Sequence, residues 1–137
     1  MIDIQSFNKS TDEFDQREKR TNFFSLAKNL IDNGFETEGL LLILTTWNFA
    51  IFRYAVKTFD IDNFSTTLGN LKQNFDKFIG QDFQSINLDN YKSDIKKIYS
   101  DLSKIKCVEY TSTPKLMHLK SPTVFVMWDA YIPGNKP

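Results

Sequence analysis

Residues Leu40–Val56 read LLLILTTWNFAIFRYAV, and this stretch decides the fold. Thirteen of its seventeen residues are apolar. On a helical wheel they cover every side, which leaves no polar face wide enough for solvent. Asn48 and Arg53 interrupt the run, which is also short for a membrane span. We therefore predict a buried central helix over about Glu36–Thr58.

Helical spacing of apolar residues continues on both sides of this stretch. The first helix is expected to begin at the capping-box residue Ser10 and to end at Gly34, since glycine readily takes the left-handed conformation that closes a helix. A short last helix is expected with Thr113 as its N-cap and Pro114 next, where the missing N–H would have no partner. The predicted helices are about Ser10–Gly34, Glu36–Thr58, Asp62–Gly80, Asp89–Ile105 and Thr113–Pro122.

The segment Thr123–Trp128 follows the last predicted helix and is expected to be extended. No internal repeat or linker divides the chain. Residues 1–137 are thus predicted to form a single all-α domain. Its architecture would be a compact bundle of about five helices around a central apolar helix, with a short extended segment near the C-terminus.

The chain carries no net charge, but its two halves differ. Seventeen basic and seventeen acidic residues cancel, so no overall field attracts nucleic acid or a membrane surface. Residues 1–91 hold nine basic against thirteen acidic side chains, whereas residues 92–137 hold eight against four. A polyanion is therefore expected to prefer the C-terminal half, and DNA is the partner predicted there.

Cysteine and histidine each occur once, as Cys107 and His118. A lone cysteine excludes an internal disulfide and a cysteine-based zinc site. We predict no metal and no cofactor. The N-terminal residues lack the apolar core of a signal peptide and are too acidic for a transit peptide. A cytoplasmic protein with no membrane partner is expected.

The strongest candidate for chemistry is the stretch Thr113–Ala130, TPKLMHLKSPTVFVMWDA. Lys115 is predicted near the start of a helix, where the helix dipole and burial together favour a neutral, nucleophilic amine that can form a Schiff base. A carboxylate such as Asp129 can stabilise developing positive charge or activate water. His118 follows one turn after Lys115, where an imidazole suits proton transfer. The structural alternatives are an exposed lysine, a helix-capping aspartate and a hydrogen-bonded histidine.

The stretch Thr111–Ile132, TSTPKLMHLKSPTVFVMWDAYI, resembles the helix-hairpin-helix base-excision DNA glycosylases. In that family a hairpin leads into a helix that bears a lysine, and a hydrophobic segment then delivers an aspartate that caps the next helix. The resemblance implies that Lys115 is the Schiff-base nucleophile, that Asp129 is the catalytic carboxylate and that Val108–Thr113 form the hairpin. It also implies an all-helical fold. The match covers twenty-two residues, so a short, degenerate or truncated relative is expected.

Nucleic-acid binding without catalysis is a related prediction. Lysines can neutralise phosphates, hydroxyls of the predicted hairpin can donate to them, and an aromatic ring beside Asp129 can stack on a flipped base. The predicted contact residues are Lys96, Lys104, Ser112, Thr113, Lys120 and Trp128. A lysine-bearing helix face is, alternatively, an ordinary solvated surface.

A second function class stays open because the segment Val124–Ile132, VFVMWDAYI, is largely apolar. Such a segment suits contact with a partner or with a second copy of the chain. The alternative to a glycosylase-like protein is therefore a non-catalytic protein-interaction or self-associating helical domain. Its predicted form is a homodimer through this segment.

Overall fold

The structure is a computed structural model that describes residues 4–17 and 21–127. Its elements are helical, with no strand in these two ranges, and the predicted all-α class is confirmed. Two short 3₁₀ helices, η1 (Val56–Thr58) and η2 (Leu88–Tyr91), lie between longer helices. The α-helices are α1 (Ile4–Arg17), α2 (Thr21–Asp32), α3 (Glu36–Trp47), α4 (Phe49–Ala55), α5 (Ile61–Asp76), α6 (Lys92–Ser103) and α7 (Glu109–Lys120).

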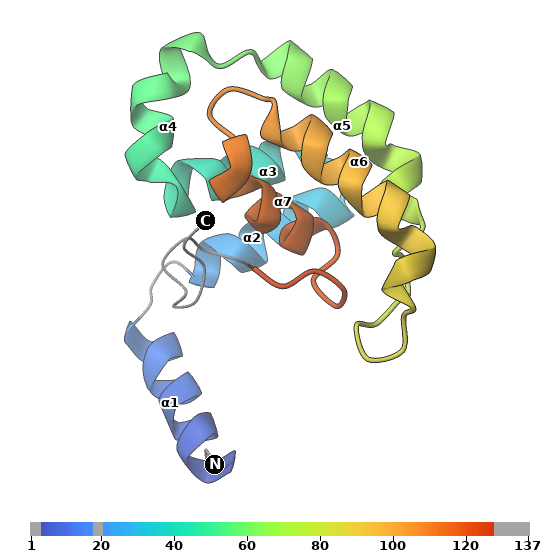
Figure 1. The fold of residues 1–137 in the computed structure, drawn as a ribbon. Coiled ribbons are helices and arrows are strands. Elements are labelled where there is room, and N and C mark those ends of the chain that lie inside the picture. The colour runs from blue at the N-terminus through green and yellow to red at the C-terminus, as the bar shows by residue number, and fades with distance from the viewer. Residues whose placement is uncertain (1–3, 18–20, 128–137) are drawn as a thin grey trace.

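The bundle is organised around α3. This helix packs against α2, α4, α5 and α7, while α6 packs against both α5 and α7. Leu40, Ile43 and Leu44 of α3 are almost fully buried, as expected of a central apolar helix. Figure 1 shows α2 to α7 gathered into one body and α1 extending away from it.

The central helix is shorter than predicted, because the expected helix Glu36–Thr58 divides at Asn48. Just before the break, the hydroxyls of Thr45 and Thr46 both donate to the carbonyl of Leu42, at 3.0 and 2.7 Å. Such hydrogen bonds from threonine to the preceding turn bend helices. Asn48 then leaves the helical conformation, with φ −123° and ψ 25°.

The second half of the apolar run, α4, faces solvent on one side. Phe52 is buried, but Phe49 and Tyr54 are 58% and 74% exposed. Arg53 is exposed as well, and its guanidinium lies 4.5 Å from the ring centroid of Tyr54. Arg53 therefore rests on an aromatic ring at the surface, which corrects the prediction that the whole run is buried.

Glycine at the end of α2 behaves as predicted. Gly34 has a φ of +88°, in the left-handed region. The N–H of Phe35 donates to the carbonyl of Leu30 at 2.9 Å, and that of Gly34 donates to Ile31 at 3.0 Å. This pair of hydrogen bonds satisfies carbonyls that the helix end would otherwise leave free.

Two predicted helix starts are wrong. Helix α1 begins at Ile4, well before the capping-box residue Ser10. Helix α5 was predicted to begin at about Asp62, but it begins at Ile61 and is capped by Asp60, whose carboxylate accepts the N–H of Asn63 at 2.9 Å. An aspartate two residues earlier along the chain can cap the free N–H groups of the helix start, so spacing alone did not select the cap.

The last helix also begins earlier than predicted, at Glu109 in place of Thr113. Cys107 and Glu109 both have positive φ, 81° and 49°, and turn the chain sharply into α7. Pro114 consequently lies inside α7 instead of at its first position. Among the described helices, none is both long and apolar enough to cross a membrane.

Candidate functional site

The predicted catalytic pair is only half described. Lys115 lies on α7 with 8% of its surface exposed, and it has an interaction partner, so its amine is not free. Asp129 lies outside the described residues, as does Trp128. The separation of the Lys115 amine from the Asp129 carboxylate is therefore not defined, and the Schiff-base role of Lys115 stays a prediction.

His118 has a structural environment. Its Nδ1 lies 2.6 Å from the carbonyl oxygen of Phe125, so Nδ1 carries the proton and donates. Its ring lies 5.5 Å, centroid to centroid, from the ring of Phe24. The imidazole thereby fastens the segment after α7 to the bundle, which matches the alternative of a hydrogen-bonded structural histidine.

The predicted hairpin Val108–Thr113 is helical from Glu109 onwards, which corrects the expectation drawn from the resemblance. Ser112 and Thr113 are completely buried. The amide of Asn48 donates to the Ser112 hydroxyl, and the Thr113 hydroxyl donates to the carbonyl of Glu109 at 2.6 Å. Both hydroxyls lie inside the bundle, so a phosphate at the surface cannot reach them.

The predicted phosphate-binding lysines do not form one common surface. Lys96 is exposed on α6, and Lys104 lies 3.5 Å from the carboxylate of Asp101. Lys120 is mostly buried, 2.5 Å from the carboxylate of Glu36 and 5.3 Å from the ring centroid of Phe75. Lys120 therefore joins α7 to α3 and α5, and it is engaged within the protein.

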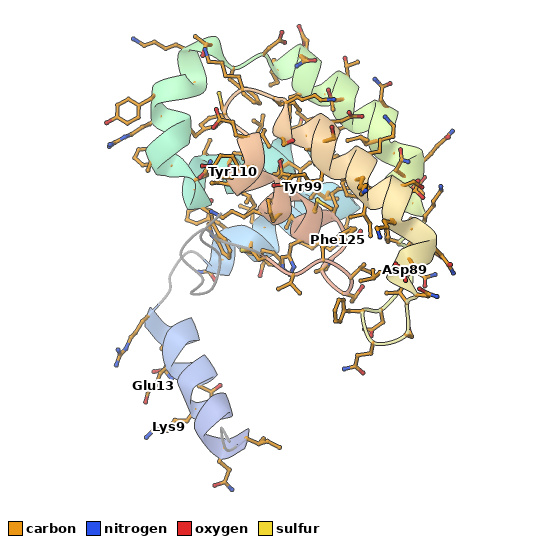
Figure 2. All side chains as sticks on the ribbon, viewed as in Figure 1. Lys9, Glu13, Asp89, Tyr99, Tyr110 and Phe125 are labelled. Carbon is orange, nitrogen blue, oxygen red and sulfur yellow. The ribbon has the colours of Figure 1, made fainter. Side chains whose placement is uncertain are left out.

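An apolar groove lies on the side of the bundle where α6 and α7 pack together. Its volume is about 330 Å³. Two residues come from α6, two from α7, two from the chain between α5 and α6, and three from the segment after α7. The lining residues are Phe83, Leu88, Ile95, Tyr99, Pro114, Met117, Val124, Phe125 and Val126. Figure 2 labels Tyr99 on α6 and Phe125 on the segment beyond α7.

The spacing along α6 explains one wall of the groove. Ile98 and Leu102 are fully buried and face the core. Ile95 and Tyr99 are four residues apart on the neighbouring face, so they share one side of the helix. The same helix therefore serves the core with one stripe and the groove with the adjacent one.

Hydrogen bonds between two loops fix the opposite wall. The N–H of Phe83 donates to the carbonyl of Thr123 at 2.9 Å, and the Thr123 hydroxyl donates to the carbonyl of Gln81 at 2.7 Å. The N–H groups of Val124 and Phe125 both donate to Ser121. These bonds hold the loop before α6 against the segment after α7.

The described lining of the groove is apolar and partly exposed. Phe83, Tyr99 and Val126 are 54%, 40% and 65% exposed. Among the lining side chains of residues 4–17 and 21–127, the Tyr99 hydroxyl is the single oxygen or nitrogen. Exposed apolar surface of this kind is typical of a contact site for another apolar group.

Titratable groups away from the groove have structural roles. Hydrogen bonds from Lys77 and Asn74 hold the pKa of the buried Asp94 carboxyl below its ordinary value. Burial raises the pKa of the Cys107 thiol, which disfavours the reactive thiolate. Within the described ranges, no three His, Cys, Asp or Glu side chains are grouped so as to hold a metal ion.

The groove was not predicted from the sequence. Leu88 and Ile95 fitted the apolar stripe of a core helix, and Tyr99 lies beside that stripe without matching its period. Phe83 lies in the otherwise mostly polar segment after Gly80, and an apolar residue in such a loop was the available signal.

Comparison of the chain with protein family models, with curated proteins and with solved structures found no match.

Proposed function

We propose that this chain is a non-catalytic helical interaction domain that self-associates through the groove between α6 and α7. The observation that carries the proposal is the groove itself, with its apolar lining and its exposed Phe83, Tyr99 and Val126. The proposal keeps the segment that begins at Val124 as part of the contact, as the sequence suggested.

The charges permit a second copy as the occupant. The chain has seventeen basic and seventeen acidic residues, so two copies do not repel one another through net charge near neutral pH. A cytoplasmic location, inferred from the lone Cys107, belongs to the same proposal.

Sedimentation velocity over a range of concentrations tests the proposal. We expect a monomer at low concentration and a dimer at high concentration. Val126→Lys places a charge in the apolar contact, and since an unpaired buried charge is costly, the dissociation constant should rise at least about tenfold. Val126 is 65% exposed, so the bundle itself should tolerate the substitution.

Tyr54→Lys is the matched control, since Tyr54 is an exposed aromatic residue on α4, away from the groove lining. It should leave the dissociation constant unchanged. A wild-type protein that stays monomeric at every concentration would contradict the proposal, and so would a dimer that Tyr54→Lys disrupts and Val126→Lys does not.

The glycosylase-like function stays a separate prediction that rests on the resemblance alone. Borohydride added to the protein with duplex DNA carrying oxidised, deaminated or alkylated bases would trap an imine on Lys115. A trapped adduct that Lys115→Gln abolishes supports the enzyme. Duplexes left intact and unadducted across the panel rule it out.

A further inference from the structure

Helix α1 has the pattern of a helix that packs against an apolar surface. Ile4, Phe7, Thr11 and Phe14 recur at steps of three and four, which places these positions on one side of the helix. We call these four residues the α1 seam. Ile4, at its start, is 75% exposed.

Helix α1 lies apart from the described helices of its own bundle (Figure 1). Figure 1 shows α1 extending away from α2 to α7, and Figure 2 shows Lys9 and Glu13 on α1 apart from the rest of the molecule. An amphipathic helix of 14 residues without tertiary packing is marginal in water. A second surface is therefore needed to stabilise α1.

The charged residues on one flank of α1 and those beside the groove are opposite in sign. Asp12 and Asp15 fall on the flank of α1 next to the seam by helical spacing. Along the groove wall, Lys92 and Lys96 are exposed on α6, each one turn before a lining residue, Ile95 or Tyr99. Within the described part of the chain, neither lysine forms an ion pair. An acidic flank beside an apolar seam thus matches a basic rim beside an apolar groove.

We propose that α1 of one copy lies in the groove of a second copy, with its seam against Tyr99 and Val126 and its acidic flank along Lys92 and Lys96. Binding of an amphipathic helix in an apolar groove is a common form of protein recognition. Two copies that exchange α1 reciprocally close into a symmetric dimer. This inference rests on the proposed self-association and names the element that produces it.

The short connection between α1 and α2 favours exchange with another copy over return to the same copy. Three residues separate Arg17 from Thr21, so their Cα atoms can lie at most about 14 Å apart. The groove is lined by residues from α6, α7 and the two loops beside them, and none belongs to α2 or α3.

The first experiment changes the seam. Ile4→Lys combined with Phe7→Lys should raise the dissociation constant of the dimer about 100-fold, because two apolar contacts are lost in each half of the dimer. Gln16→Lys adds a lysine on the opposite side of α1, where Gln16 is exposed, and should have no effect. Both changes lie on α1, which extends away from α2 to α7 (Figure 1), so the bundle should keep its fold.

The second experiment mixes two variants that are each monomeric. Val126→Lys keeps an intact α1, and the seam variant keeps an intact groove. Mixed together they should form a one-to-one complex, because one α1 and one groove still match. The complex should be weaker than the wild-type dimer and detectable by sedimentation.

The outcomes separate the two proposals. If Val126→Lys prevents dimers while the seam variant associates like the wild type, the groove remains the contact and α1 is not its occupant. If both variants are monomeric and their mixture forms no complex, α1 acts within its own copy and exchange is ruled out. A wild-type monomer at every concentration removes the self-association on which the inference rests.

Discussion

Helices α3 and α4 come from one apolar run in the sequence, yet they have opposite environments. In α3, Leu40 and Leu44 are completely buried. In α4, Phe49 and Tyr54 are 58% and 74% exposed, although Phe49 is as apolar as the leucines of α3. Apolar composition therefore did not decide burial here. Burial was decided by the break at Asn48. After the break the chain continues as α4 in a new direction, in which the rest of the bundle leaves one side of the helix uncovered.

The largest loss of stability is expected for a substitution in α3, the buried half of the apolar run. Leu44→Ala should lower the free energy of unfolding by about 2–5 kcal/mol, since it removes a fully buried side chain and leaves a cavity. Chemical denaturation monitored by circular dichroism measures this change. Phe49→Ala is the matched control in α4, and it should cost much less. Equal losses of stability from Leu44→Ala and Phe49→Ala would contradict the difference in burial between α3 and α4.

The close packing of the buried helix α3 against α2 provides a second test of the difference between α3 and α4. A Cβ added at Gly39 of α3 would lie 2.6 Å from the backbone oxygen of Ala27 and 2.9 Å from Ile31. Gly39→Ala should therefore force the two helices apart and lower the free energy of unfolding by about 3 kcal/mol.

Gly69→Ala provides the control for Gly39→Ala. Gly69 lies inside α5, and a Cβ there would meet nothing within 4 Å. Alanine should raise the free energy of unfolding by about 0.5–1 kcal/mol, because it restricts the unfolded chain and favours the helix. A Gly39→Ala protein as stable as the wild type would mean that α2 and α3 are not closely packed.

The fold class was predictable because it depends on periodicity, and periodicity is local. Leu68, Leu71 and Phe75 recur at helical spacing and are buried in α5 as expected. The full environment of the break at Asn48 was not predictable in the same way. Beside the local hydrogen bonds of Thr45 and Thr46, the Asn48 amide donates to Ser112, which lies sixty-four residues further along the chain. No local window of sequence contains both partners.

The candidate site was less predictable than the fold. Lysines and a histidine drew attention because their side chains can do chemistry, but Lys120 and His118 are held by Glu36 and by the carbonyl of Phe125. The groove combines residues from four separate segments, and each of these residues resembles an ordinary core residue. Only the tertiary arrangement distinguishes an apolar residue that lines a groove from one that fills the core.

An intermediate loss of stability is expected when the hydrogen bond of Asn48, the residue at the break, is removed. Ser112→Ala removes the partner of the Asn48 amide, and both residues are buried. A buried donor left without an acceptor should lower the free energy of unfolding by about 1–2 kcal/mol. Denaturant unfolding measures it. The double variant with Asn48→Ala should cost less than the sum of the two single changes, because the pair acts as a unit. Strict additivity would show that the bond does not hold α3 and α7 together.

The smallest effect is expected on the exposed side of α4. Tyr54→Ala removes an aromatic ring on which Arg53 rests at 4.5 Å from the ring centroid, and an exposed cation–π contact contributes about 0.5–1 kcal/mol. Thermal unfolding should therefore change little. Phe52→Ala, on the buried side of the same helix, is the control and should destabilise strongly, since Phe52 packs edge to face against Phe59 at 5.3 Å. If Tyr54→Ala destabilises as much as Phe52→Ala, the Tyr54 side of α4 is covered by another part of the protein, and α4 is a second core helix like α3.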